Sequence, residues 1–294
     1  MRGLRPRPAA SGVMQQSFAL PRLSNRSIRR QQGASVPPRW RTGLVQVGNE
    51  MRQEAPRAVT IICNALREQI AHGLLPPGGK LPAERRLSEL FGTTRITLRE
   101  ALVQLESRGL IYREERRGWF ASPPRLAYDL MRRSHFHAMV SAQGRVASTQ
   151  VLTARLQPAP AAICELLRLP ALSSVVQISR ARRIDGRLVL YVEHYLNPAY
   201  FPDILDADLT QSLTELYASR YGLSYGQVRF EMVPTALPAE AAAALRVSHG
   251  TPGLRIARVN HDQHGRLIDC DFEYWRHDAI HVSAVVTGPA DTAG

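Results

Sequence analysis

The chain has 294 residues, of which 44% are hydrophobic, so it is long enough to form two domains with separate cores. No stretch approaches the roughly 18 apolar residues of a transmembrane helix, and the arginine-rich N-terminus lacks an apolar segment of signal-peptide length. We therefore expect a cytoplasmic protein without membrane association. The net charge of +13 favours nucleic acid as a partner, although residues 1–50 supply +8 of it through nine arginines less one acid, Glu50.

Residues 1–50 lack sustained periodicity and are rich in Arg, Pro, Ser and Gln, which predicts a disordered basic tail. The tail is compatible with a basic arm on DNA phosphates or with a mitochondrial-type transit peptide. We favour a third interpretation, in which translation begins at Met51 or the tail is passive, because organised sequence starts just after that residue.

The three cysteines, Cys63, Cys164 and Cys270, lie far apart, and no pair has the spacing of metal ligands. Their odd number also fits poorly with a disulfide framework, so we expect buried thiols. The nine histidines show no ligand-like pattern, since His135 and His137 are two apart with no evident partner. The sequence therefore predicts no metal site and no cofactor.

Residues 51–122 are expected to form a winged helix-turn-helix domain. Apolar residues recur at helical spacing in three segments, which end near Gly73, Gly92 and Gly109. Two short strands around a charged turn then form a β-ribbon, the wing. The expected elements are helices over 56–75, 83–91 and 94–108 and strands over 110–113 and 118–121.

The third helix of this domain is the expected recognition helix. Arg95 and Arg99 are four residues apart and therefore share an outward face, which Thr94 and Thr97 flank. Arginine suits this face because its planar guanidinium donates two parallel hydrogen bonds to guanine or phosphate. The alternative is an ordinary solvated charged face. The expected DNA contacts are Arg85, Thr94, Arg95, Thr97, Arg99 and, at the wing tip, Arg117 and Gly118.

The run LPAERRLSELFG at 81–92 and the run TRITLREAL at 94–102 strongly resemble the GntR family of bacterial repressors. The resemblance implies a bacterial, nucleoid-associated protein that binds double-stranded operator DNA as a homodimer at near-palindromic sites. Arg86 departs from the acidic residue often found at its position, which bears on operator preference and not on the fold. The positions that contact operator DNA in that family correspond here to Arg85, Arg95, Thr97, Arg99 and Gly118.

Residues 123–128 are expected to be a linker, 129–286 an α+β domain and 287–294 a tail. Asp185-Gly186 and His264-Gly265 each separate two strand-like segments in the manner of a hairpin turn. Antiparallel hairpins with helices on one side indicate the α+β class. The expected helices cover 129–142, 159–168, 208–221 and 238–246, and the expected strands cover 147–156, 174–184, 187–196, 225–235, 254–262 and 266–276.

This second domain resembles the UTRA sensor domain of the HutC subfamily, whose fold is similar to that of chorismate lyase: an antiparallel sheet with helices. The similarity rests on ISRARRIDG at 178–186, on EHYL at 193–196 and on residues 244–254. The ending YWRHD at 274–278 matches only in part, because the family usually continues with Arg-Tyr where this chain has Ala-Ile. The resemblance implies a domain that binds a small effector.

Arg180 and Arg182 alternate along one predicted strand and so share a face, and we expect Glu193 to reach that face from across the hairpin. Two guanidiniums and a carboxylate suit a ligand with one anionic group and one cationic or hydroxyl group. The alternative is a surface ladder of ion pairs. The expected effector contacts are Arg145, Ser148, Thr149, Arg180, Arg182, Glu193, Tyr195, Asp269 and Tyr274.

Several segments also resemble regulators of phosphonate-utilisation operons, namely those at 118–125, 221–223, 258–263 and 269–278. This narrower resemblance implies 2-aminoethylphosphonate or a relative as the effector, with arginines for the phosphonate and a carboxylate for the amine. A sugar phosphate or an amino-acid catabolite fits the same residues.

The sequence thus predicts a transcriptional regulator, either a repressor or a dual regulator, whose operator binding depends on a small anionic metabolite. An enzyme of the chorismate-lyase type is the main alternative. No nucleophile–base pair or metal set supports it, so we assign no catalytic residue. A purely architectural DNA-binding protein is a third hypothesis.

Overall fold

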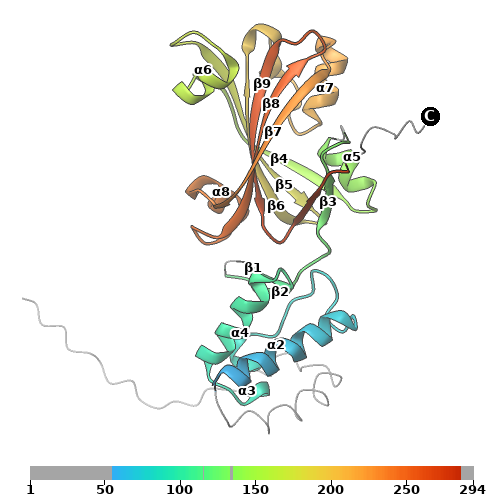
Figure 1. The fold of residues 1–294 in the computed structure, drawn as a ribbon, viewed down its shortest axis with the longest axis vertical. Coiled ribbons are helices and arrows are strands. Elements are labelled where there is room, and N and C mark those ends of the chain that lie inside the picture. Colours follow the sequence, from blue (N-terminus) through green and yellow to red (C-terminus); the bar gives the residue numbers. More distant parts are fainter. Residues whose placement is uncertain (1–54, 115, 133–134, 286–294) are drawn as a thin grey trace, which may run out of the picture. The chain divides into compact units, whose positions relative to one another are not determined.

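The structure, a computed structural model, describes residues 55–114, 116–132 and 135–285, which form two domains with separate hydrophobic cores (Figure 1). The predictions for residues 1–50 and 287–294 lie outside these described residues. Within the described part, no helix combines the length and the apolar character needed to cross a membrane.

The first domain consists of three helices followed by a β-ribbon, as the sequence predicts. Each helix turns an apolar face to a common core, in which Leu66, Leu87 and Leu102 have no exposed surface. The two strands are antiparallel, and Glu114 pairs with Gly118 at the tip. The elements are α2 (Ala55–Ala71), α3 (Glu84–Phe91), α4 (Arg95–Ser107), β1 (Ile111–Glu114) and β2 (Gly118–Ala121).

Local backbone chemistry fixes the boundary between α3 and α4. Gly92 ends α3 in the left-handed conformation, with a φ of 59°, and its N–H donates to the carbonyl of Glu89. Thr94 then becomes extended, and its hydroxyl accepts the N–H of Thr97 at 3.2 Å. Thr94 is therefore the N-cap of α4, and the recognition helix begins at Arg95.

The cysteines follow the prediction in two of three positions. The Cys63 thiol is buried between α2 and α4 and donates to the carbonyl of Ala101 at 3.4 Å. Cys270 is also buried, whereas Cys164 is only half-buried. Burial raises the pKa of the Cys63 thiol, so this side chain behaves as a small apolar core residue.

The second domain is built on a six-stranded antiparallel sheet in the order β4-β5-β6-β9-β8-β7. The β5–β6 turn has a positive φ at both Asp185 and Gly186, 51° and 79°, as tight two-residue hairpins favour. The predicted hairpins and the α+β class are therefore confirmed. The strands are β4 (Ala147–Pro158), β5 (Ser174–Ile184), β6 (Arg187–Leu196), β7 (Tyr225–Ala236), β8 (Pro252–Asp262) and β9 (Leu267–Arg276).

Helices cover both faces of this sheet, so the expectation of helices on one side was wrong (Figure 1). Helices α5 (Phe136–Ser141) and α7 (Leu213–Tyr221) pack on one face, which we call the α5–α7 face. Helices α6 (Ala161–Leu167) and α8 (Ala239–Leu245) pack on the other, the α6–α8 face. Because side chains alternate along a strand, one residue of register decides which face a side chain reaches.

The segment after the linker differs from the predicted helix over 129–142. Strand β3 (Leu126–Asp129) covers the end of the expected linker and the first residue of this segment, and it pairs in parallel with β10 (Ile280–Ser283). Of the described residues in 129–142, only Phe136–Ser141 form a helix. Leu126 is buried and Ala127 is exposed, which is the alternation of a strand. Since β10 lies near the far end of the domain, no local pattern reveals this pairing.

Candidate nucleic-acid interface and effector pocket

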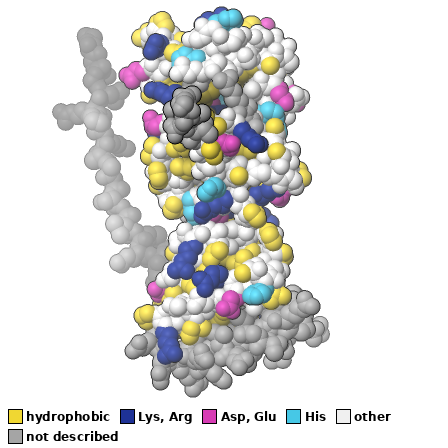
Figure 2. Space-filling view, turned by 45° about the vertical axis from the view of Figure 1, so that its right-hand side comes forward, with side chains coloured by type: hydrophobic (Ala, Val, Ile, Leu, Met, Phe, Trp, Pro, Cys, Tyr) yellow, Lys and Arg dark blue, Asp and Glu magenta, His cyan; other side chains and the backbone are white. Residues whose placement is uncertain are grey.

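The outward face of α4 carries the predicted base-reading residues. Thr94 and Arg95 are exposed at its start, and Arg99 follows one turn later with 65% of its side chain exposed. Leu98 and Leu102 are fully buried, which fixes the rotation of the helix. On the face shown in Figure 2, the basic side chains of this domain form separate patches rather than one continuous surface.

Thr94 and Thr97 both contribute to the start of α4. The Thr94 hydroxyl accepts the Thr97 N–H and lies 2.9 Å from the Thr97 hydroxyl. Each hydroxyl keeps further hydrogen-bonding capacity, so a cap and a DNA contact are compatible.

Arg85 extends from α3 with 77% of its side chain exposed, and its Nε lies 3.7 Å from Oε1 of Glu89. Arg86 lies 3.3 Å from the other oxygen of the same carboxylate. Exposed ion pairs of this kind contribute little stability and weaken with salt. Both guanidiniums therefore stay accessible to DNA phosphates at small cost.

The wing tip is a tight turn with left-handed backbone. Arg116 has a φ of 60° and Gly118 a φ of 102°. The second value is strained for any residue with a Cβ, although a Cβ would have space, since its nearest neighbour is Lys80 Cε at 3.7 Å. The exposed Arg117 pairs with Glu114 beside this turn. Backbone conformation therefore accounts for the glycine.

The α5–α7 face of the sheet holds a cavity of about 390 Å³, a size that suits a small metabolite. Aromatic side chains of Tyr128, Phe136 and Trp275 form part of its wall. Its charged and hydrogen-bonding lining includes Arg180, Arg182, His194, Arg258, Asn260 and Glu273.

Arg180 is almost fully buried in this lining. Its NH1 donates to the carbonyls of Leu209 at 3.3 Å and Gln211 at 3.0 Å, and its NH2 lies 2.8 Å from His194 Nε2. Burial and the nearby arginines lower the pKa of His194 well below its usual value, so the ring is neutral and its Nε2 accepts from Arg180. The buried Nε of Arg180 has no hydrogen-bond partner.

Arg182 lies one alternation further along β5 and faces the same cavity. Its guanidinium lies 4.8 Å from the centroid of the Phe136 ring, and its buried Nε has no hydrogen-bond partner. Burial lowers the pKa of Arg182 to about 10, so it is still charged at neutral pH. A buried cation with an unused donor is costly unless a ligand supplies an acceptor.

The third guanidinium, that of Arg258, is already compensated by carboxylates. Its Nε donates to both oxygens of Asp271 at 2.8 and 3.1 Å, and its NH2 lies 3.3 Å from Glu273. These two carboxylates raise the pKa of Arg258 despite its burial. Among the described residues, neither Arg180 nor Arg182 forms an ion pair, so they are the cations left for an anionic ligand.

The expectation that Glu193 shares the face of these arginines was wrong. Arg180 pairs with Val192, so Glu193 points to the α6–α8 face. There its carboxylate accepts the Tyr191 hydroxyl at 3.0 Å, and burial raises its pKa. Two other expected contacts, Tyr195 and Tyr274, belong to the clusters of that same face.

The expected anion cradle of Arg145, Ser148 and Thr149 does not line the cavity. Arg145 Nε donates to Asp185 at 2.7 Å, and Ser148 is exposed. The Thr149 hydroxyl lies 3.2 Å from Nε2 of His137, which does line the cavity, so Thr149 belongs to the layer behind the wall.

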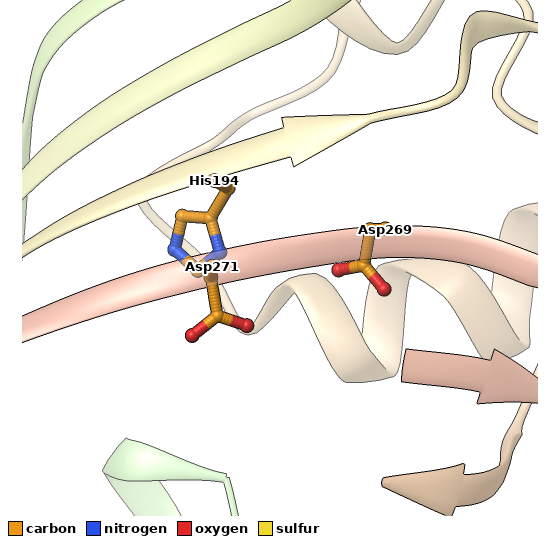
Figure 3. A group of neighbouring side chains, drawn as sticks. All are labelled: His194, Asp269 and Asp271. Atoms are coloured by element: carbon orange, nitrogen blue, oxygen red, sulfur yellow. The ribbon is translucent and has the colours of Figure 1, made fainter. Parts of the chain in front are cut away.

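Asp269 lies beside the pocket with His194 and Asp271, and the ligand-type atoms of the three side chains are within 4.8 Å of one another (Figure 3). Asp269 accepts the hydroxyl of Tyr225 at 3.2 Å, and burial together with the Asp271 charge raises its pKa to about 7. Arg180 donates a hydrogen bond to His194, and Arg258 donates one to Asp271. A cation would have to displace these guanidiniums, so we interpret the group as part of a polar network.

Sequence reasoning missed the pocket residues of the segment after the linker. His135 caps α5 and lies 2.8 Å from Glu215, and Phe136 and His137 line the cavity. The aromatic residues around 135–137 were a usable signal, but a helix assigned over the whole segment concealed their placement.

The family comparisons agree with both domains. Residues 60–121 match the family described as bacterial regulatory proteins, gntR family, and residues 142–281 match the UTRA domain. The chain is 31% identical to an uncharacterized HTH-type transcriptional regulator, YihL of Escherichia coli K12, over 71% of this chain and 89% of that one. It is 28% identical to the HTH-type transcriptional repressor NagR of Bacillus subtilis, over 74% and 89%.

The fold also matches a solved structure. The crystal structure of PhnF from Mycobacterium smegmatis aligns with a TM-score of 0.55 and 24% identity, covering 76% of this chain and 99% of that chain. This match supports the two-domain fold and does not by itself identify a ligand.

Proposed function

This chain belongs to the GntR family of bacterial transcriptional regulators and carries a UTRA domain, and from this premise we propose that it is a homodimeric repressor released from its operator by a small phosphonate. The anion is held by Arg180 and Arg182. The observation that carries the proposal is Arg182, a buried cation that lines the cavity and has no carboxylate within ion-pair distance among the described residues.

The cavity also offers an acceptor for the amine of 2-aminoethylphosphonate, though not the one expected from the sequence. Glu273 lines the cavity, whereas Glu193 faces away from it. The Glu273 carboxylate accepts Trp275 Nε1 at 2.7 Å and lies 3.3 Å from Arg258, so these two contacts fix its position. An anion between the arginines and an amine near Glu273 would satisfy both ends of a short zwitterion.

The pocket has a direct covalent route to the DNA-binding domain. The lining residues from Tyr128 to Met139 begin at the end of the linker, and the linker directly follows the wing. A ligand that changes the conformation of this segment changes the constraint on the linker, and hence the placement of the winged helix.

The homodimer is supported by the two edges of the sheet. The edge strands β4 and β7 carry exposed apolar side chains, namely Leu152, Leu156, Met232 and Val233. Edges of this kind are normally covered. We propose a second copy of the chain as the partner, because two winged helices are needed to read the two halves of a near-palindromic operator.

Isothermal titration tests the effector assignment. The intact chain is titrated with 2-aminoethylphosphonate and, separately, with glucosamine-6-phosphate, which represents the sugar-phosphate alternative. We expect binding of the phosphonate with one site per chain. Binding of the sugar phosphate alone would identify a sugar phosphate as the effector in place of a phosphonate. Binding of neither ligand would contradict the proposal of a phosphoanion effector.

A further inference from the structure

One carboxylate in the DNA-binding domain connects all three elements that form the expected DNA surface. Glu84 is the first residue of α3. Its Oε2 accepts the Arg99 Nε of α4 at 3.1 Å, and its Oε1 accepts the Trp119 Nε1 of β2 at 3.0 Å. Glu84 therefore links α3, the recognition helix and the wing through hydrogen bonds.

The Trp119 side of this link is rigid. Trp119 is only 5% exposed and packs in the core of the domain, and its carbonyl accepts the N–H of Leu81. Its indole has a single donor, which Glu84 occupies. The carboxylate is thus held by a fixed residue on one side.

The Arg99 side is exposed and oriented outward. The bond to Glu84 uses Nε, which leaves the two terminal nitrogens of the guanidinium to donate to DNA. Without an anchor, a long exposed arginine samples many rotamers, and ordering it on DNA costs conformational entropy.

The charge of the carboxylate also matters. Burial alone raises the pKa of Glu84, but the hydrogen bonds from Trp119 and Arg99 lower it overall, so Glu84 is ionised at neutral pH. An ionised carboxylate beside DNA repels phosphates of every sequence equally. Its charge therefore weakens binding to operator and non-operator DNA alike, and only its hydrogen bond to Arg99 can change the ratio between them.

We propose that Glu84 is a positioning residue that raises operator specificity by orienting Arg99. The proposal rests on Arg99 as a DNA contact and is independent of the effector. The Glu89 pairs with Arg85 and Arg86 do not serve this purpose, because they lie within a single helix.

The test uses the intact chain and a duplex that the wild type selects from a randomised library, with a scrambled duplex of the same composition as the non-specific probe. Fluorescence anisotropy gives both affinities, and their ratio is the specificity. For Glu84→Gln we expect the ratio to fall about fivefold or more, with tighter binding to the scrambled duplex. Trp119→Phe removes the indole donor without changing charge, so the ratio falls while non-specific affinity stays constant.

Glu100→Gln is the matched control, because Glu100 is exposed on α4, outside this network, and the substitution changes charge by the same amount. It should strengthen binding to both duplexes equally. In an Arg99→Ala background, Glu84→Gln should change the ratio no further.

An unchanged ratio in both Glu84→Gln and Trp119→Phe, with Arg99→Ala still impaired, would overturn the positioning role alone. An Arg99→Ala variant with wild-type binding would overturn the Arg99 contact and this inference together. Thermal unfolding of each variant identifies loss of folding, and the uncharged Trp119→Phe change keeps the test decisive if Glu84→Gln is unstable.

Discussion

At the scale of single residues, the pocket depends on alternation along strands. Arg180 and Arg182 could be predicted as a pair because residues two apart share a face whatever the exact register. Glu193 could not be placed, because its face depends on pairing with β5, and it lies opposite Ser179 rather than Arg180. Its neighbour His194 reaches the pocket instead.

The role of Arg182 can be tested by a substitution that keeps a polar side chain and removes the positive charge. Arg182→Gln should weaken 2-aminoethylphosphonate binding by roughly 10- to 100-fold, since a hydrogen bond to a charged group is lost in a buried site. Isothermal titration measures the change. Arg145→Gln is the control, because Arg145 forms an ion pair with Asp185 outside the cavity. This variant should bind 2-aminoethylphosphonate with the affinity of the wild type.

The carboxyl group of Asp269 should make the stability of the folded state depend on pH. Its pKa is raised to about 7 by burial and by Asp271, so between its unfolded value and pH 7 the folded state holds more protons than the unfolded state. Stability from this group therefore falls as pH rises through about 7. Denaturant unfolding of Asp269→Asn should show wild type losing stability relative to the variant between about pH 5 and about pH 7, with little further change at higher pH. A difference that does not vary with pH would contradict the assignment.

At the scale of elements, the sequence was most informative where structure is local. The three helices of the first domain follow from apolar spacing and end signals, and the cap at Thr94 is a contact between neighbours in sequence. The strand β3 was missed because its partner β10 is distant and the pairing covers only four residues. Because a helix was predicted over this segment instead, the aromatic residues of the pocket wall were not predicted either.

The cap at Thr94 should be measurable as stability of the first domain. Thr94→Ala removes the acceptor of the Thr97 N–H and should cost about 1 kcal/mol of unfolding free energy. Thr94→Ser keeps the hydroxyl and should cost much less. Urea unfolding followed by helical circular dichroism compares them, and equal losses in both variants would mean that the methyl group and not the cap matters.

At the scale of the whole molecule, the proposed binding to a near-palindromic operator requires two copies of the chain. Sedimentation equilibrium should give twice the chain mass of 32.7 kDa, with or without ligand. A monomer at micromolar concentration would contradict the proposed partner for the β4 and β7 edges. Sequence alone implies this dimer only by family resemblance, because a surface that pairs with its own copy has no local sequence pattern.

In the proposed mechanism, an anion held by Arg180 and Arg182 controls operator binding. The most direct measurement is fluorescence anisotropy of the selected operator bound to the intact chain, titrated with 2-aminoethylphosphonate, for wild type and Arg182→Gln. We expect wild type to release the operator as the ligand saturates the pocket and Arg182→Gln to stay bound at the same ligand concentration. Operator affinity that is unchanged when the wild-type pocket is full, or equal release from both proteins, would contradict it.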